Sequence, residues 1–157
     1  MKCNQKDLVI GLQAEKYFKS KKNKNQSHSK VMTTLLVFTA NWCETCVYTY
    51  TMWVNFANRF TTQKLQVVEV DTSKFETIAR QFKVNFKDGN QLPSLVLLED
   101  NKEYLRFPPV DYEKGTLGKV LSFKEKELIK YFDLDKRFLA TQNAAGEGEI
   151  VKKKAHV

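Results

Sequence analysis

Cysteine and long apolar runs are both scarce in this chain. Only three of its 157 residues are cysteine, too few for a small secreted scaffold held by disulfides. A domain of this length buries roughly 68–70% of the surface of its unfolded chain, so it needs no such framework. The longest apolar-leaning run, 34–42, is about half of the ~20 residues that span a membrane, and the N-terminus lacks the apolar segment of a signal peptide. We therefore expect one compact domain without a transmembrane helix.

Positive charge is concentrated near the N-terminus. The formal net charge is +8, and residues 1–34 carry eight lysines against two acidic residues, whereas 35–139 are nearly balanced. Residues 19–30 are too polar to bury apolar surface, which predicts a solvated loop. The alternative role for this loop is a contact with membrane proteins or anionic lipid. No aromatic residues are interleaved with its lysines, so we expect no nucleic-acid partner.

Apolar periodicity predicts alternating strands and helices. The strands are expected at 35–38, 65–71 and 95–98, with a return strand at 103–107 after a turn at Asp100-Asn101. Helices are expected from about Cys43 to Phe60, over 75–82, and over 7–18. A last helix is expected to open with a capping box at 122–125 and to turn four residues inward: Leu128, Ile129, Phe132 and Leu139. This order predicts an α/β fold with a mixed β-sheet flanked by helices.

Composition and apolar periodicity together predict three parts in the chain. Residues 1–33 are expected to form an N-terminal helix and a basic loop, and residues 34–139 the folded domain. Within that domain, 108–121 has weak periodicity and predicts an irregular insertion. Residues 140–157 are expected to be a disordered C-terminal tail.

A C-x-x-C sequence lies between the first predicted strand and its helix, at Cys43-Glu44-Thr45-Cys46. This spacing occurs in zinc ribbons as well as in redox-active cysteine pairs. A structural zinc site needs four ligands, and the chain has no second cysteine pair, so we expect neither a metal nor another cofactor. The free N–H groups of a helix N-terminus favour a thiolate on its first residue. We predict that Cys43 is the exposed attacking sulfur and Cys46 the buried resolving sulfur.

The second candidate element is Leu92-Pro93-Ser94, just before the third predicted strand. A proline at the first residue of a strand removes no ladder hydrogen bond, which is a purely structural explanation. The sharper hypothesis is a cis Leu92-Pro93 bond, although only about 5–6% of X-Pro bonds are cis.

Three segments together resemble the thioredoxin superfamily: residues 37–46, 67–71 and 91–97, in the order of its active-site strand, following strand and cis-proline strand. The resemblance to its branch of thioredoxin-related transmembrane proteins extends over about 15–139. It implies the thioredoxin fold, a substrate platform formed by Trp42, Leu92 and Pro93, and protein thiols or disulfides as partners. It also implies a location at the endoplasmic reticulum membrane, with the cytoplasm as the alternative.

Two features depart from a redox-active thioredoxin domain. In the redox-active domains that this chain resembles, a buried acidic residue lies six positions before the first cysteine. This chain has Val37 at that position. The intervening Glu44-Thr45 supplies no histidine to hold a thiolate, and the charge of Glu44 would repel one. The pair is therefore expected to exchange slowly and to be a poor oxidant.

The sequence is compatible with two alternative functions. The leading hypothesis is a thiol-disulfide oxidoreductase in which Cys43 reacts with a disulfide and Cys46 resolves the mixed disulfide. The alternative is a redox-weak adaptor or binding module with a thioredoxin fold, belonging to a membrane-associated protein. Val37 favours the adaptor, and the presence of both cysteines favours the oxidoreductase.

Overall fold

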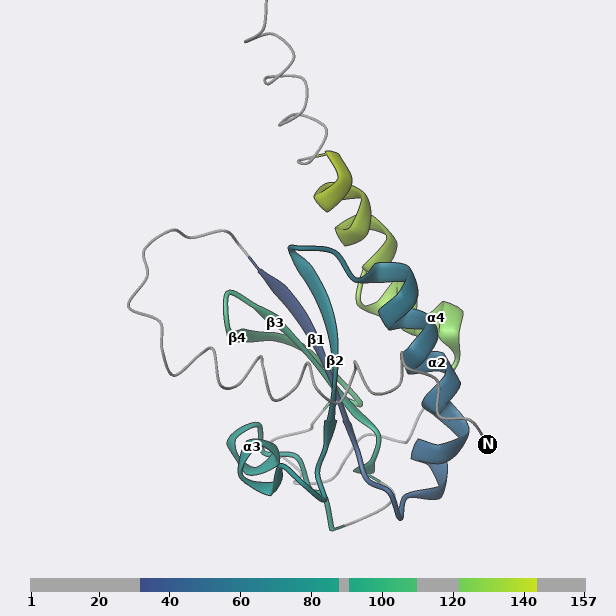
Figure 1. Cartoon of the computed structure of the whole chain (residues 1–157), viewed down its shortest axis with the longest axis vertical. Helices are drawn as coiled ribbons and strands as arrows, with labels where there is room; N and C mark the ends of the chain where they lie inside the picture. The colour runs from purple at the N-terminus through teal and green to yellow at the C-terminus, as the bar shows by residue number, and fades with distance from the viewer. Residues whose placement is uncertain (1–31, 88–90, 110–121, 144–157) are drawn as a thin grey trace, which may run out of the picture.

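The computed structural model describes residues 32–87, 91–109 and 122–143 (Figure 1). Four expectations lie wholly or mainly outside these residues: the helix at 7–18, the basic loop at 19–30, the insertion at 108–121 and the tail from 144 onward. The described helix that begins at 134 runs to 143, four residues beyond the expected boundary at 139.

A four-stranded mixed sheet forms the centre of the molecule, in the order β2-β1-β3-β4. Its strands are β1 (Thr33–Thr39), β2 (Leu65–Asp71), β3 (Ser94–Glu99) and β4 (Lys102–Phe107). β1 pairs with β2 in parallel and with β3 antiparallel, and β3 pairs antiparallel with β4. Both faces of β1 are buried, which explains why it is a continuous apolar run from Leu35 to Phe38. The predicted mixed sheet is confirmed.

Helices cover both faces of this sheet (Figure 1). α2 (Glu44–Phe60) and α4 (Glu125–Tyr131) lie over one face, and the short α3 (Glu76–Gln81) lies over the other. The apolar spacing along α2 predicts that Cys46, Tyr50, Trp53, Ala57 and Phe60 face the core. In the structure Tyr50 and Ala57 are only half-buried, and Thr49 and Phe56 are buried instead. Phe75 and Phe82 flank α3 as its end residues, as the sequence predicted to within one position.

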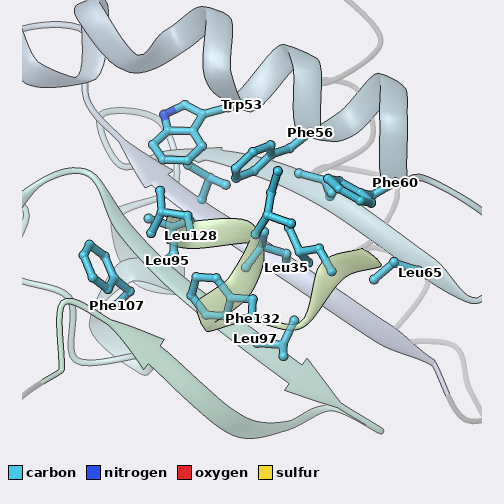
Figure 2. Close-up of a cluster of buried hydrophobic side chains, with 14 residues drawn as sticks. Leu35, Trp53, Phe56, Phe60, Leu65, Leu95, Leu97, Phe107, Leu128 and Phe132 are labelled. Carbon is cyan, nitrogen blue, oxygen red and sulfur yellow. The ribbon is translucent and has the colours of Figure 1, made fainter. Parts of the chain in front are cut away.

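The larger core lies between the sheet and the helices α2 and α4 (Figure 2). Aromatic rings from α2 interdigitate with aliphatic side chains of β1 and β3, and Trp53 and Phe56 meet edge to face at 5.6 Å between ring centroids. The main members are Leu35, Val37, Trp53, Phe56, Phe60, Leu65, Leu95, Leu97, Phe107, Leu128 and Phe132. This core fixes the axis of α2, and therefore the position of the cysteines at its start.

The β3–β4 turn is built by two residues with positive φ, Asp100 at 49° and Asn101 at 68°. Asp and Asn tolerate this left-handed region better than other non-glycine residues, so the predicted turn at these residues is confirmed. The Asp100 carboxylate also accepts a hydrogen bond from the backbone N–H of Met32 at 3.1 Å.

Two predictions for the last helix are wrong. α4 begins at Glu125 with Lys124 as its N-cap and without a side-chain cap hydrogen bond, so Ser122 does not form the predicted capping box. Leu139 is 59% exposed instead of buried. The reason is that the helix ends at Tyr131, and Asp133, with φ of 51°, redirects the chain into a second helical stretch at 134–143. Leu128, Ile129 and Phe132 are buried as predicted.

Candidate functional site

The C-x-x-C sequence sits where β1 passes into α2. Cys43 is the N-cap residue, with an extended backbone (φ −83°, ψ 113°). Its sulfur accepts a hydrogen bond from the backbone N–H of Cys46 at 3.2 Å. This is the role that a serine or aspartate oxygen usually plays at a helix start, so the sulfur is held against the positive end of the helix. The predicted place of Cys43 at a helix N-terminus is confirmed.

The prediction that Cys43 is exposed is wrong, because the residue is only 2% exposed. The cause is the loop before β3: the Cys43 thiol donates to the backbone carbonyl of Leu92, at 3.6 Å between sulfur and oxygen. Leu92 and Pro93 are themselves buried, so this loop covers the sulfur.

Cys46 lies one turn into α2 and is 4% exposed, which confirms its predicted burial. Burial, followed by the side-chain hydrogen bond with Cys43, raises the pKa of the Cys46 thiol from 9.0 to about 12. At neutral pH this sulfur is therefore a protonated thiol and a weak nucleophile. Neither cysteine is in a disulfide.

The Leu92-Pro93 peptide bond is cis, as the sharper hypothesis predicted. Leu92 belongs to the same buried cluster as Cys43 and Cys46, although it lies 49 residues from Cys43 along the chain. The structure thus brings together the C-x-x-C sequence and the proline loop.

Trp42, the remaining residue of the predicted platform, is 54% exposed. Two further large apolar side chains are exposed on the first two turns of α2, Val47 at 64% and Tyr48 at 78%. Sequence reasoning missed these two residues. The available signal was their place on the helix, since both fall outside the apolar stripe that faces the core.

A groove of about 410 Å³ opens beside Cys46. It is lined by residues from the end of β1, the first turns of α2 and the end of β2: Thr39, Ala40, Asn41, Cys46, Val47, Tyr50, Thr51, Glu69 and Asp71. Glu69 was not singled out from the sequence. The alternation Leu65, Val67, Glu69 along β2 was the signal, because it assigns this carboxylate to the face that α2 covers.

Val37, at the position where the superfamily resemblance implies an acid, is fully buried on β1 beneath α2. Its partner in the parallel register is Glu69 of β2. The face of the sheet beside the cysteines therefore has an apolar residue on β1 and a carboxylate on the neighbouring strand.

A family model for thioredoxin matches residues 12–117, more than half of the chain, and the chain belongs to the thioredoxin family. It is also similar to curated thioredoxin-related transmembrane proteins. It is 27% identical to protein 2-B of Danio rerio over 83% of this chain and 43% of that protein. It is 25% identical to protein 2 of Xenopus laevis over 84% of this chain and 46% of that protein. The chain thus spans less than half the length of these relatives.

Solved thioredoxin structures are similar as well. Thioredoxin-2 of the malaria parasite, described as a component of a protein secretion machinery, matches with a TM-score of 0.49 and 23% identity, covering 69% of this chain and 88% of that one. A thioredoxin from Nicotiana alata matches with a TM-score of 0.49 and 21% identity, covering 76% and 81% respectively. The mixed sheet with helices on both faces is the fold expected of the thioredoxin family.

Within 32–87, 91–109 and 122–143, no three or more His, Cys, Asp or Glu side chains gather in a way that could hold a metal ion. In that same part of the chain, no helix has both the length and the apolarity to cross a membrane.

Proposed function

We propose that the domain carries out thiol-disulfide exchange through Cys43 and Cys46. The observation that supports this most strongly is the geometry at the start of α2, where the Cys43 sulfur caps the helix and accepts the N–H of Cys46. A sulfur held at a helix N-terminus is stabilised as a thiolate by the same N–H groups and dipole that favour other anions there.

The exchange proceeds in two displacements. The Cys43 thiolate attacks one sulfur of a substrate disulfide, a Cys43–substrate bond forms, and the other substrate sulfur leaves as a thiolate. Cys46 then loses its proton and attacks the Cys43 sulfur, so that a Cys43–Cys46 disulfide forms and the second substrate thiolate departs. The substrate disulfide is reduced to two thiols and the cysteine pair is oxidised. The reverse sequence oxidises a substrate dithiol.

The surroundings favour a protein substrate. Trp42 directly precedes Cys43, and Val47 and Tyr48 lie on the first two turns of the helix that Cys43 caps. Their exposed apolar surface suits the side chains of an extended peptide. Leu92 and Pro93 complete the platform in this proposal. A substrate must reach the Cys43 sulfur past the loop that covers it, and this requirement is a reason to expect slow exchange.

The second candidate function is a binding module without efficient turnover. It is favoured by Val37, which cannot take a proton from Cys46, and by the 2% exposure of Cys43. The same exposed apolar side chains would then bind a protein partner that never enters a covalent intermediate.

We also propose that the protein resides at the endoplasmic reticulum membrane. The names of its relatives, thioredoxin-related transmembrane proteins of Danio rerio and Xenopus laevis, support the membrane. The compartment is what the resemblance to that branch implies. The basic residues 19–30 would then contact anionic lipid or membrane proteins. Fractionation of cells that express the protein tests this location, and recovery only in the cytosolic fraction would reject it.

Trapping the mixed disulfide tests the exchange activity. In a Cys3→Ser background, which leaves only the two site thiols, a peptide disulfide is added and the products are identified by mass spectrometry. We expect Cys46→Ser to accumulate a peptide adduct on Cys43, and Cys43→Ser to form much less adduct. If no adduct forms on Cys43, the binding module is the better description.

A further inference from the structure

Three titratable side chains line the groove beside Cys46: Tyr50 from α2, and Glu69 and Asp71 from the end of β2. Outside the groove lining, the Cys43 thiol also acts on Cys46, through a hydrogen bond and its charge. A proton that leaves the Cys46 thiol on this side enters the groove among these groups.

Glu69 is the carboxylate that the fold directs toward α2. Leu65 and Val67, the preceding residues on its face of β2, are buried in the core beneath that helix. Glu69 follows them at a half-buried position, and the hydroxyl of Thr39 donates to its Oε1 at 2.9 Å. This hydrogen bond orients the carboxylate at the end of β1, which is also where the turn to Cys43 begins.

Resolution of a mixed disulfide requires a proton acceptor for Cys46. A thiol that remains protonated far above neutral pH must lose its proton before it can attack. Val37 cannot accept this proton. Glu69 and Cys46 line the same groove. The negative charge of Glu69 is the last of the causes that raise the pKa of Cys46, after burial, the hydrogen bond with Cys43 and the charge of Cys43.

We propose that Glu69 is the proton acceptor for Cys46 during resolution, replacing from β2 the acid that is missing at Val37 on β1. The inference rests on the proposed exchange function. The Cys46 thiol gives its proton to the Glu69 carboxylate, directly or through one water in the groove, as its sulfur bonds to that of Cys43. The Cys43–substrate bond breaks, the substrate sulfur leaves with the electron pair, and the proton on Glu69 then passes to solvent or to this thiolate.

Asp71 is the other carboxylate in the groove, and it has a different role. Its Oδ1 accepts the backbone N–H of Ser73 at 2.9 Å, which caps the turn after β2. Asp71→Asn retains an oxygen for this hydrogen bond, as Glu69→Gln retains one for Thr39. The two variants are therefore a matched pair, each removing one charge from the same groove.

The experiment measures the two displacements separately, near pH 7, in the Cys3→Ser chain. Formation of the mixed disulfide is followed in a Cys46→Ser background, and its decay by rapid quench and mass spectrometry with Cys46 present. We expect Glu69→Gln to slow decay about 100-fold, at the lower end of general-base effects, and to change formation less than about twofold. Asp71→Asn should change neither rate. The decay rate of Glu69→Gln should also rise about tenfold per pH unit, because the reaction then depends on thiol that ionises in solution.

Different results would overturn the role of Glu69 and the exchange function itself. If Glu69→Gln resolves the mixed disulfide as fast as the wild type, Glu69 is not the acceptor, although exchange itself stands. If the wild-type chain forms no mixed disulfide, both are overturned. Should Glu69→Gln fail to fold, Thr39→Val tests the same claim, since loss of the orienting hydroxyl should slow decay several-fold and an unchanged rate would overturn the proposal.

Discussion

Val37 and Glu69 are direct partners across the parallel β1–β2 pair. Val37 is fully buried, whereas Glu69 reaches the groove that Cys46 also lines. An apolar residue thus occupies the tightly packed position, and the charge lies one strand away, where solvent still reaches it. This arrangement avoids the cost of burying a carboxylate and keeps one close to the resolving thiol.

Moving the carboxylate to β1 is the first test of this relationship. With sequence information alone, Val37→Glu would be expected to speed resolution by supplying a base. With Glu69 opposite, we expect lower stability, by about 2 kcal/mol or more, because a buried carboxylate loses its water and faces a like charge. Resolution should be no faster than in the wild type. Urea unfolding and mixed-disulfide decay measure the two effects.

The double variant Val37→Glu with Glu69→Gln is the control for that substitution. It carries one carboxylate, now on β1, and it should resolve the mixed disulfide faster than Glu69→Gln alone. A single Val37→Glu variant that outpaces the wild type would show that Glu69 does not already supply the base.

The raised pKa of Cys46 predicts a loss of stability in alkali. In the unfolded chain this thiol ionises near pH 9, whereas in the folded chain it keeps its proton to about pH 12. Between these values the folded state binds more protons, so the free energy of unfolding falls as pH rises, by up to about 1.4 kcal/mol per pH unit. Urea unfolding of the reduced protein at pH 8 to about 10.5 measures this slope.

Cys46→Ala is the control for the alkaline measurement, since other groups also titrate in that range. The variant should start from a lower stability but lose less of it as pH rises. Equal slopes for the wild type and Cys46→Ala would mean that the Cys46 pKa is the same in the folded and unfolded chains.

Trp42→Ala tests the proposed substrate platform. Because Trp42 is 54% exposed, its truncation should leave the thermal midpoint nearly unchanged. We expect kcat/KM to fall about tenfold for a protein disulfide, which is the loss expected when one modest interface contact is removed. For a small organic disulfide kcat/KM should change little.

Tyr104→Ala is the matched control, because Tyr104 is also an exposed aromatic residue, 61% exposed, but lies on β4. It should not affect either substrate. If Trp42→Ala and Tyr104→Ala behave alike with the protein disulfide, Trp42 has no special part in binding.

Local patterns in the sequence predict much of the fold. The apolar run at 35–38, the helical spacing after Cys46 and the Asp100-Asn101 turn each reflect forces between near neighbours in the chain, and the structure confirms all three. The start of α4 could not be predicted in this way. Ser122 suits a cap chemically, but the helix begins beyond its reach, at Glu125.

The site was harder to predict, because its details depend on contacts between distant segments. Cys43 is buried in a cluster that includes Leu92, 49 residues away, to which its thiol also donates a hydrogen bond. The place of Glu69 depends on the register between β1 and β2, which sets Val37 opposite it. A sequence shows that Glu69 interrupts an apolar strand, but only the register shows which thiol it approaches.

The reduction potential of the Cys43/Cys46 pair is the most direct test of the exchange function. The Cys3→Ser chain is equilibrated with thiol-disulfide buffers, and the oxidised fraction is measured by alkylation and mass spectrometry. We predict one two-electron transition at a potential closer to the roughly −270 mV of thioredoxin than to the roughly −120 mV of a strong oxidant, because Glu44 places negative charge beside the Cys43 sulfur. Failure to form a Cys43–Cys46 disulfide at any potential in this range would contradict the account.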